Sequence, residues 1–204
     1  ITWTSSNPEI ASVDPVTGTI TGRDAGGSLG SLSSQKCTIT ATSAANGVTR
    51  EIQLTVTGKT GKYLSDVEIT GTNYLEMGQE TDLSYQVFPK RVAESNNLYV
   101  TWGMVTGEDE DGNTTYSWAT DDAPATDGRG QIDKTGHYKV VSGGNSTVVL
   151  KAQTGYYLSS SKFYEISSKT ATFDMSNGIP VENITISVDD ALGIASSINK
   201  TTDV

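Results

Sequence analysis

Residues 37–42 read Cys-Thr-Ile-Thr-Ala-Thr, and residues 51–57 read Glu-Ile-Gln-Leu-Thr-Val-Thr. In both stretches apolar side chains occupy every second position, and polar side chains, mostly threonine, occupy the positions between them. A period of two places alternate side chains on opposite faces of a β-strand, so one face is buried and the other is wet. Such half-buried strands are typical of antiparallel sheets.

The same alternation recurs at residues 83–87 and 170–175, and short turn signals such as Asn46-Gly47 and Asp111-Gly112 separate the runs. No stretch shows convincing helical spacing. The sequence therefore predicts an all-β protein, built from antiparallel β-sandwiches.

Composition and charge exclude several classes of function. The net charge of −10 and the scattered basic residues argue against nucleic-acid binding. No apolar run approaches the ~20 residues of a membrane-spanning helix, so we expect no membrane insertion in this segment. The single cysteine, Cys37, excludes an intrachain disulfide and a cysteine metal cage. The chain starts at Ile1 rather than Met, and we expect it to be a piece of a longer protein.

An internal repeat is visible. Trp3 precedes Ser-Val-Asp at 12–14 and Thr-Gly-Thr-Ile-Thr-Gly at 17–22. Trp102 likewise precedes Gln-Ile-Asp at 131–133 and Thr-Gly-His-Tyr at 135–138. The spacing from Trp to Asp is 11 residues in the first copy and 31 in the second, which indicates an insertion near 104–130.

Residues 2–14, Thr-Trp-Thr-Ser-Ser-Asn-Pro-Glu-Ile-Ala-Ser-Val-Asp, and 18–22, Gly-Thr-Ile-Thr-Gly, resemble the bacterial immunoglobulin-like domain, group 2. This family occurs in tandem in bacterial surface proteins such as intimin- and invasin-type adhesins, and in some phage virion proteins. The resemblance covers 1–58, extends more loosely over 63–175, and returns in an opening strand at 180–188. It implies an immunoglobulin-like sandwich, an extracellular setting and no catalytic residues. The second copy departs from the family by its insertion.

We therefore predict tandem immunoglobulin-like antiparallel β-sandwiches in three segments. Residues 1–58 form a first module that lacks its first strands, and residues 59–178 form a second module with a loop insertion near 104–130. Residues 179–204 supply the opening strand of a third module or a donor strand.

The first module has an apparent deficit of strands, since only two residues precede Trp3 whereas 35 separate Val67 from Trp102 in the second copy. Two explanations are open. Either a long tandem array has been cut at arbitrary points, or the tail of one copy completes the first module of the next copy. The strand-donor candidates alternate along the tail: Ile184, Ile186 and Val188.

Reactive groups are sparse. The only histidine, His137, has the position of a surface strand residue, and no Gly-x-Ser-x-Gly elbow occurs. Cys37 falls on the apolar side of its strand. Asp109, Asp111 and Asn113 have part of a calcium-loop spacing, but the later bidentate Glu is missing, which favours a solvated acidic loop. We expect no enzyme activity, no cofactor and no metal site.

The remaining recognition candidates are aromatic. Trp3 and Trp102 are expected in the two cores. Tyr116 and Trp118 lie in the insertion, and Tyr156 and Tyr157 adjoin a glycine at an expected hairpin tip. Exposed aromatic side chains at such places stack on sugars or anchor a protein partner. We predict binding at these residues: Tyr116, Trp118, Tyr156 and Tyr157.

The predicted function is that of a non-enzymatic extracellular structural or adhesion module of a bacterial cell-surface or filament protein. Its partners would be neighbouring modules or copies of the same chain, and a host-surface protein or glycan. Three alternatives remain: a pilus-like subunit that donates a strand from 181–204 into module 1–58 of the next copy, an accessory carbohydrate-binding domain of a secreted hydrolase, and a phage virion decoration domain.

Overall fold

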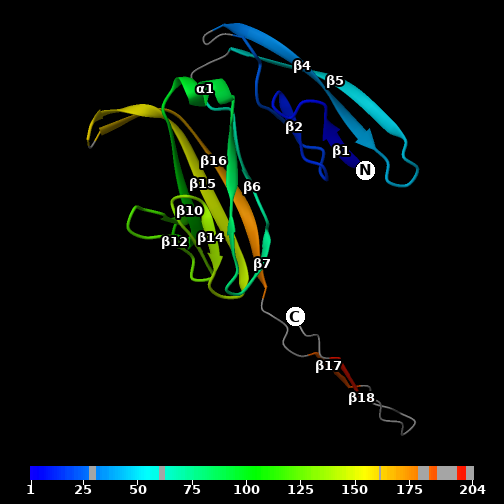
Figure 1. Cartoon of the computed structure of the whole chain (residues 1–204). Coiled ribbons are helices and arrows are strands. Elements are labelled where there is room, and N and C mark those ends of the chain that lie inside the picture. The colour runs from blue at the N-terminus through cyan, green and yellow to red at the C-terminus, as the bar shows by residue number, and fades with distance from the viewer. Residues whose placement is uncertain (28–30, 60–62, 161, 179–183, 188–196, 201–204) are drawn as a thin grey trace.

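A computed structural model describes residues 1–27, 31–59, 63–160, 162–178, 184–187 and 197–200. β-Strands dominate these residues, which confirms the prediction of an all-β fold (Figure 1). The alternating stretches at 37–42 and 51–57 lie in β4 (Leu32–Thr42) and β5 (Thr49–Lys59), which pair antiparallel along their whole length.

The first module consists of two small layers. A sheet in the order β1-β4-β5 faces the β2-β3 hairpin, and Ile10, Ala11, Cys37 and Ile39 are buried between them. Trp3 packs against this cluster and is half-buried. The remaining strands of the module are β1 (Thr2–Ser5), β2 (Ala11–Val13) and β3 (Ile20–Gly22).

The second module is a complete sandwich. One layer has the order β11-β10-β15-β16-β7, with β7 parallel to β16, and the other contains β12-β13-β14-β8 and β6-β9. Its elements are β6 (Asp66–Thr70), β7 (Tyr74–Glu76), β8 (Glu80–Asp82), β9 (Ser84–Phe88), α1 (Lys90–Ser95), β10 (Leu98–Glu108), β11 (Thr114–Trp118), β12 (Ala125–Thr126), β13 (Gly130–Ile132), β14 (His137–Val140), β15 (Gly144–Ser159) and β16 (Lys162–Gly178).

This strand order is that of an immunoglobulin-like sandwich. Only one residue separates β8 from β9, so together they form one long strand between β6 and β14, as strand B lies between A and E in the ABED sheet. β10, β15 and β16 follow the order of the CFG sheet. Trp102 and Tyr138, 2% and 0% exposed, fill the core between the layers.

The repeated motif builds the same tight turn in both modules. Oδ1 of Asp14 accepts hydrogen bonds from the backbone N–H groups of residues 16 and 17, and Oδ1 of Asp133 accepts them from residues 135 and 137. The backbone bonds lower the pKa of Asp14. At Asp133 burial acts to raise the pKa, but the hydrogen bonds from the Thr135 hydroxyl and from the backbone of residues 137 and 135 together lower it. The glycine that follows, Gly18 or Gly136, has a positive φ and lies against the indole of Trp3 or Trp102. The motif is therefore a structural turn beneath the core tryptophan.

The interior of the first module is less covered than that of the second. Strand register makes Ile20 the counterpart of Tyr138, and Ile52 the counterpart of Phe173. Ile20 and Ile52 are 42% and 56% exposed, whereas Tyr138 is buried and Phe173 packs against the core. In the second module β7 pairs with the outer edge of β16 and β8 with that of β14; within the described ranges, no strand pairs with the corresponding edges of β5 and β3.

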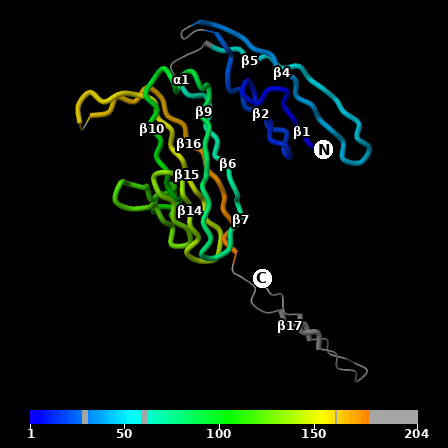
Figure 2. Tube along the Cα trace, viewed as in Figure 1, coloured from blue at the N-terminus to red at the C-terminus, as the bar shows by residue number. Residues whose placement is uncertain are grey.

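One helix departs from the sequence-based expectation of strands alone. α1 spans six residues after Pro89, which is too short for a helical period to be visible in the sequence. At the far end of the chain, β17 (Ile184–Ser187) and β18 (Ser197–Lys200) pair antiparallel (Figure 1). Figure 2 traces the path of the chain through the two modules that precede them.

Candidate functional site

The two modules meet around one buried arginine. Arg23, just after β3, is 7% exposed, and its guanidinium lies 4.2 Å from the centroid of the Phe88 ring. Its Nε donates to Asp66 and its Nη2 to Glu68, both at 2.8 Å, while Nη1 donates to the backbone carbonyl of Pro8 at 3.2 Å. Each donating nitrogen therefore has its own acceptor, and two of the three acceptors belong to the second module.

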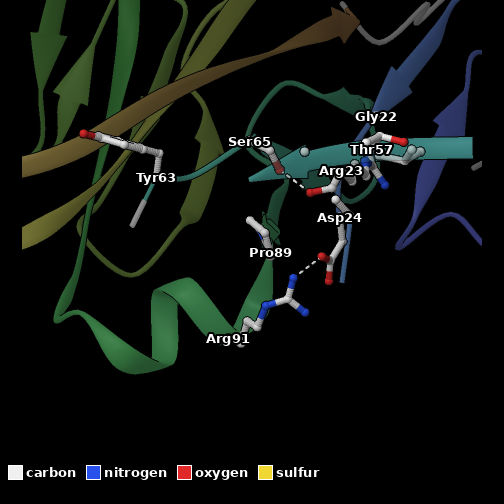
Figure 3. A pocket seen from close by; sticks show the side chains of 11 residues that line it. Gly22, Arg23, Asp24, Thr57, Tyr63, Ser65, Pro89 and Arg91 are labelled. Carbon is white, nitrogen blue, oxygen red and sulfur yellow. Dashed lines mark hydrogen bonds and ion pairs between the residues drawn. The ribbon is translucent and has the colours of Figure 1, made fainter. Parts of the chain in front are cut away.

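Two ion pairs and a backbone contact flank this arginine. Lys90 and Arg91 of α1 pair with Glu9 and Asp24 of the first module. The Ser65 hydroxyl donates to the backbone carbonyl of Arg23 at 2.5 Å. Figure 3 shows Arg91 with Asp24, and Ser65 with Arg23, around a cleft of about 180 Å³ that residues from both modules line.

The geometry favours one fixed orientation of the modules. Charge-assisted hydrogen bonds in a planar guanidinium fork depend strongly on direction, and the ring of Phe88 fixes the plane of the fork. Removing one partner of a buried ion pair leaves the other charge unpaired at a high cost. Asp66 and Glu68 are 25% and 44% exposed at their side chains, so water screens part of this attraction.

Three of the four predicted aromatic residues share one surface. Trp118 and Tyr116 pair with Gly103 and Val105, and Tyr157 pairs with Phe163, on the face of the five-stranded sheet that points away from the core. Tyr157 lies in ring contact with Tyr99 and Phe163 there. Tyr156 lies instead on the opposite face of the hairpin, where it stacks with Tyr164 at 5.2 Å.

The strand-donor candidates fall in the tail. Ile184 and Ile186 belong to β17, where their backbones pair with Lys200 and Ile198 of β18. Val188 lies outside the described residues.

His137 lies on the surface of β14. Its two ring nitrogens are 2.7 Å from a carboxylate oxygen of Asp82 and 3.2 Å from one of Glu80. Lys139 also pairs with Glu80, at 2.8 Å. The hydrogen bonds to Asp82 and then Glu80 raise the pKa of His137.

The acidic insertion forms a self-contained turn. Asp109 accepts hydrogen bonds from the backbone of Asp111 and from the backbone and side chain of Asn113, and these bonds lower its pKa. Within the part of the chain that the structure describes, no three His, Cys, Asp or Glu side chains gather where they would hold a metal ion. No helix in that part has the length and apolarity needed to cross a bilayer.

Sequence reasoning missed the joint and two of the five residues of the aromatic surface. Arg23 follows an ordinary strand, and its acidic partners lie 43 and 45 residues further along the chain. No local pattern connects them. Tyr99 and Phe163 occupy positions on the solvent-facing side of their strands. An aromatic residue at a position where the alternation predicts a polar one is the signal that would have found them.

No protein-family model matches the sequence, and no curated protein matches it either. Among solved structures, similarity is found to the "Three N-terminal domains of the bacteriophage RB49 Highly Immunogenic Outer Capsid protein (Hoc)", with 11% identity and a TM-score of 0.34. The match covers 88% of this chain and 57% of that chain. A likeness this low carries no argument about function, and the fold assignment rests on the strand order described above.

Proposed function

We propose that this chain is a non-enzymatic extracellular structural module that holds neighbouring parts of a surface, filament or virion protein at a fixed distance and orientation. The observation that carries this proposal is the joint at Arg23. A flexible linker would let two sandwiches reorient freely, whereas a buried arginine with acceptors on both modules holds them in one arrangement.

The acidic, threonine-rich surface supports the same role. A net charge of −10 keeps an extended array soluble and resists lateral association. The extracellular setting is carried over from the resemblance to bacterial immunoglobulin-like domains. An adhesin stalk and a virion decoration both require such a spacer.

A second candidate is a pilus-like subunit joined by strand donation. The uncovered edges of β3 and β5, with Ile20 and Ile52 exposed beside them, favour it. Here a chain with Ile184→Asp and Ile186→Asp would remain monomeric at concentrations where the parent chain forms filaments in electron micrographs. A parent chain that stays monomeric throughout would exclude this candidate.

Small-angle X-ray scattering tests the rigid spacer. The parent chain should give one distance distribution from 50 to 500 mM NaCl, on the order of a threefold change in Debye length, because Arg23 is buried at the centre of the joint. Arg23→Ala should weaken docking by about 2 kcal/mol and broaden that distribution. Arg50→Ala is the matched control, since Arg50 is exposed and its Nη1 donates only to the carbonyl of Thr49.

Two results of these measurements would argue against the rigid spacer. A parent chain that already scatters as a broad ensemble at low salt would contradict it, as would an Arg50→Ala chain that loosens as much as Arg23→Ala.

A further inference from the structure

The outer face of the five-stranded sheet carries aromatic side chains at both ends. At the β11 end, the ring centroids of Tyr116 and Trp118 lie 5.4 Å apart. The two residues are 42% and 36% exposed. At the hairpin end, three rings contact one another, with centroid distances of 5.0 to 5.4 Å: those of Tyr99, Tyr157 and Phe163. Neither group belongs to the core cluster of the module.

Trp118 lies close against the sheet at Gly103. A Cβ atom added to Gly103 would come within 2.7 Å of the indole, so the glycine provides the space for this close approach. Val149, the partner of Gly103 on β15, is fully buried although it is outside the core cluster. The indole therefore lies against Gly103, and the residue remains 36% exposed.

A row of polar groups begins between the two aromatic ends and runs into the hairpin end, because Lys151 pairs with Thr101, Gln153 with Tyr99 and Glu165 with Gly155. Glu165 accepts hydrogen bonds from Gln153 and from Ser168, the latter at 2.8 Å, and Lys151 lies 4.0 Å from it. The two hydrogen bonds lower the pKa of Glu165 and keep it ionised as an acceptor. The row thus offers amide, hydroxyl, ammonium and carboxylate groups on one open surface.

We propose that this face binds an extended polysaccharide chain. Aromatic rings pack against the apolar faces of sugar rings, and the polar row matches sugar hydroxyls, which both donate and accept. Tyr99 and Gly103 are four positions apart on β10, which is about 13 Å along a strand. A ligand that touches both aromatic ends must therefore be a chain of several sugars rather than one.

The polar centre favours a glycan over a protein partner. The centre of a protein interface is dry and depleted in charged groups, with its aromatic anchors clustered there. On this face Lys151 lies between the two aromatic groups and Glu165 lies among the rings of the hairpin end, so charged groups adjoin the aromatic rings instead of being kept to a rim. A hydrated sugar chain satisfies those charges where a dry protein surface would leave them unpaired.

The inference adds a ligand class to the proposed function and stands on the second module alone. The joint contacts of that module come from Ser65, β6, Phe88 and α1, which are not part of this face. Arg23→Ala should therefore loosen the joint and leave glycan binding unchanged, so failure of either proposal is recognised separately.

An array of immobilised polysaccharides, with neutral glucans, mannans and galactans and with uronic-acid polymers, is the first test. Calorimetry with oligosaccharides of rising length from the bound polymer follows. We expect affinity to rise with chain length, and Tyr157→Ala to weaken it by about threefold to tenfold. Trp118→Phe should weaken it similarly while still covering Val149. Tyr156→Ala is the matched control on the opposite face of the same hairpin and should bind like the parent chain.

Three results would overturn the proposal: no polysaccharide on the array binds, Tyr157→Ala and Trp118→Phe bind like the parent chain, or Tyr156→Ala weakens binding as much as they do. A face that captures only proteins would belong to the first case.

Discussion

At the scale of single residues, a buried polar trio marks the second module. The Tyr138 hydroxyl donates to Oδ1 of Asn177 at 3.0 Å, and Nδ2 of Asn177 donates to the Ser146 hydroxyl at 2.9 Å. All three residues are buried. Burial raises the pKa of Tyr138, so the hydroxyl keeps its proton and remains a donor.

Tyr138→Phe removes one donor from this trio and leaves Oδ1 of Asn177 buried without it. We expect a loss of about 1–2 kcal/mol in the free energy of unfolding, measured by urea denaturation. Tyr156→Phe, which removes an exposed hydroxyl, should change the free energy by less than about 0.5 kcal/mol. Equal losses in the two variants would contradict the account of the trio.

His137 makes the stability of the folded chain depend on pH, in a direction that follows from its pKa shift. Its pKa is raised in the folded protein by Asp82 and Glu80, so the folded state binds the proton more tightly than the unfolded chain does. The resulting stability is fully present below the unfolded pKa of 6.5 and is lost as the pH rises through the folded value. Because His137 is the only histidine, the melting temperature should fall over that window, and His137→Gln should abolish the fall. Titration of the imidazole by NMR checks the direction, and a folded pKa below 6.5 would contradict it.

At the scale of elements, the turn beneath each tryptophan explains why the repeat is visible in the sequence. Gly136 has φ +92°, and an added Cβ would lie 2.8 Å from the backbone oxygen of Leu83 and 2.9 Å from the Trp102 indole. A side chain there meets both an unfavourable backbone conformation and rigid neighbours.

Gly136→Ala should therefore destabilise the second module by about 2–4 kcal/mol. Gly128→Ala is the matched control, because Gly128 has a similar φ of +85° but no atom within 4 Å of an added Cβ. It should lose only about 1 kcal/mol for the backbone conformation. Thermal unfolding followed by tryptophan fluorescence measures both, and a Gly136→Ala loss no larger than the control would refute this role of the indole.

The sequence predicts elements well where one face of a strand is buried. The alternation at 37–42 and 51–57 depends only on neighbouring residues, and it gives β4 and β5 directly. The aromatic face was predicted in part, because which side chains share it depends on register. The irregular pairing between Thr154 and Gly155 adds one residue to β16 and so brings Phe163 opposite Tyr157, and period-two reasoning does not foresee a bulge.

At the scale of the whole molecule, the contacts that matter are the ones no local pattern reveals. Arg23 looks like any charged residue after a strand, and only the folded chain brings it to Phe88, Asp66 and Glu68. Fold class follows from periodicity, whereas the orientation of two modules follows from a few long-range pairs. The sequence predicts no reactive chemistry, and the joint is the feature that supports the proposed role as a spacer.

The most direct test of this account is the measurement of backbone residual dipolar couplings in the two modules of the weakly aligned parent chain. The account predicts that both modules report one alignment tensor, equal in magnitude and orientation, because they tumble as a single body. Two different tensors, with the smaller first module averaged to weaker alignment, would contradict it.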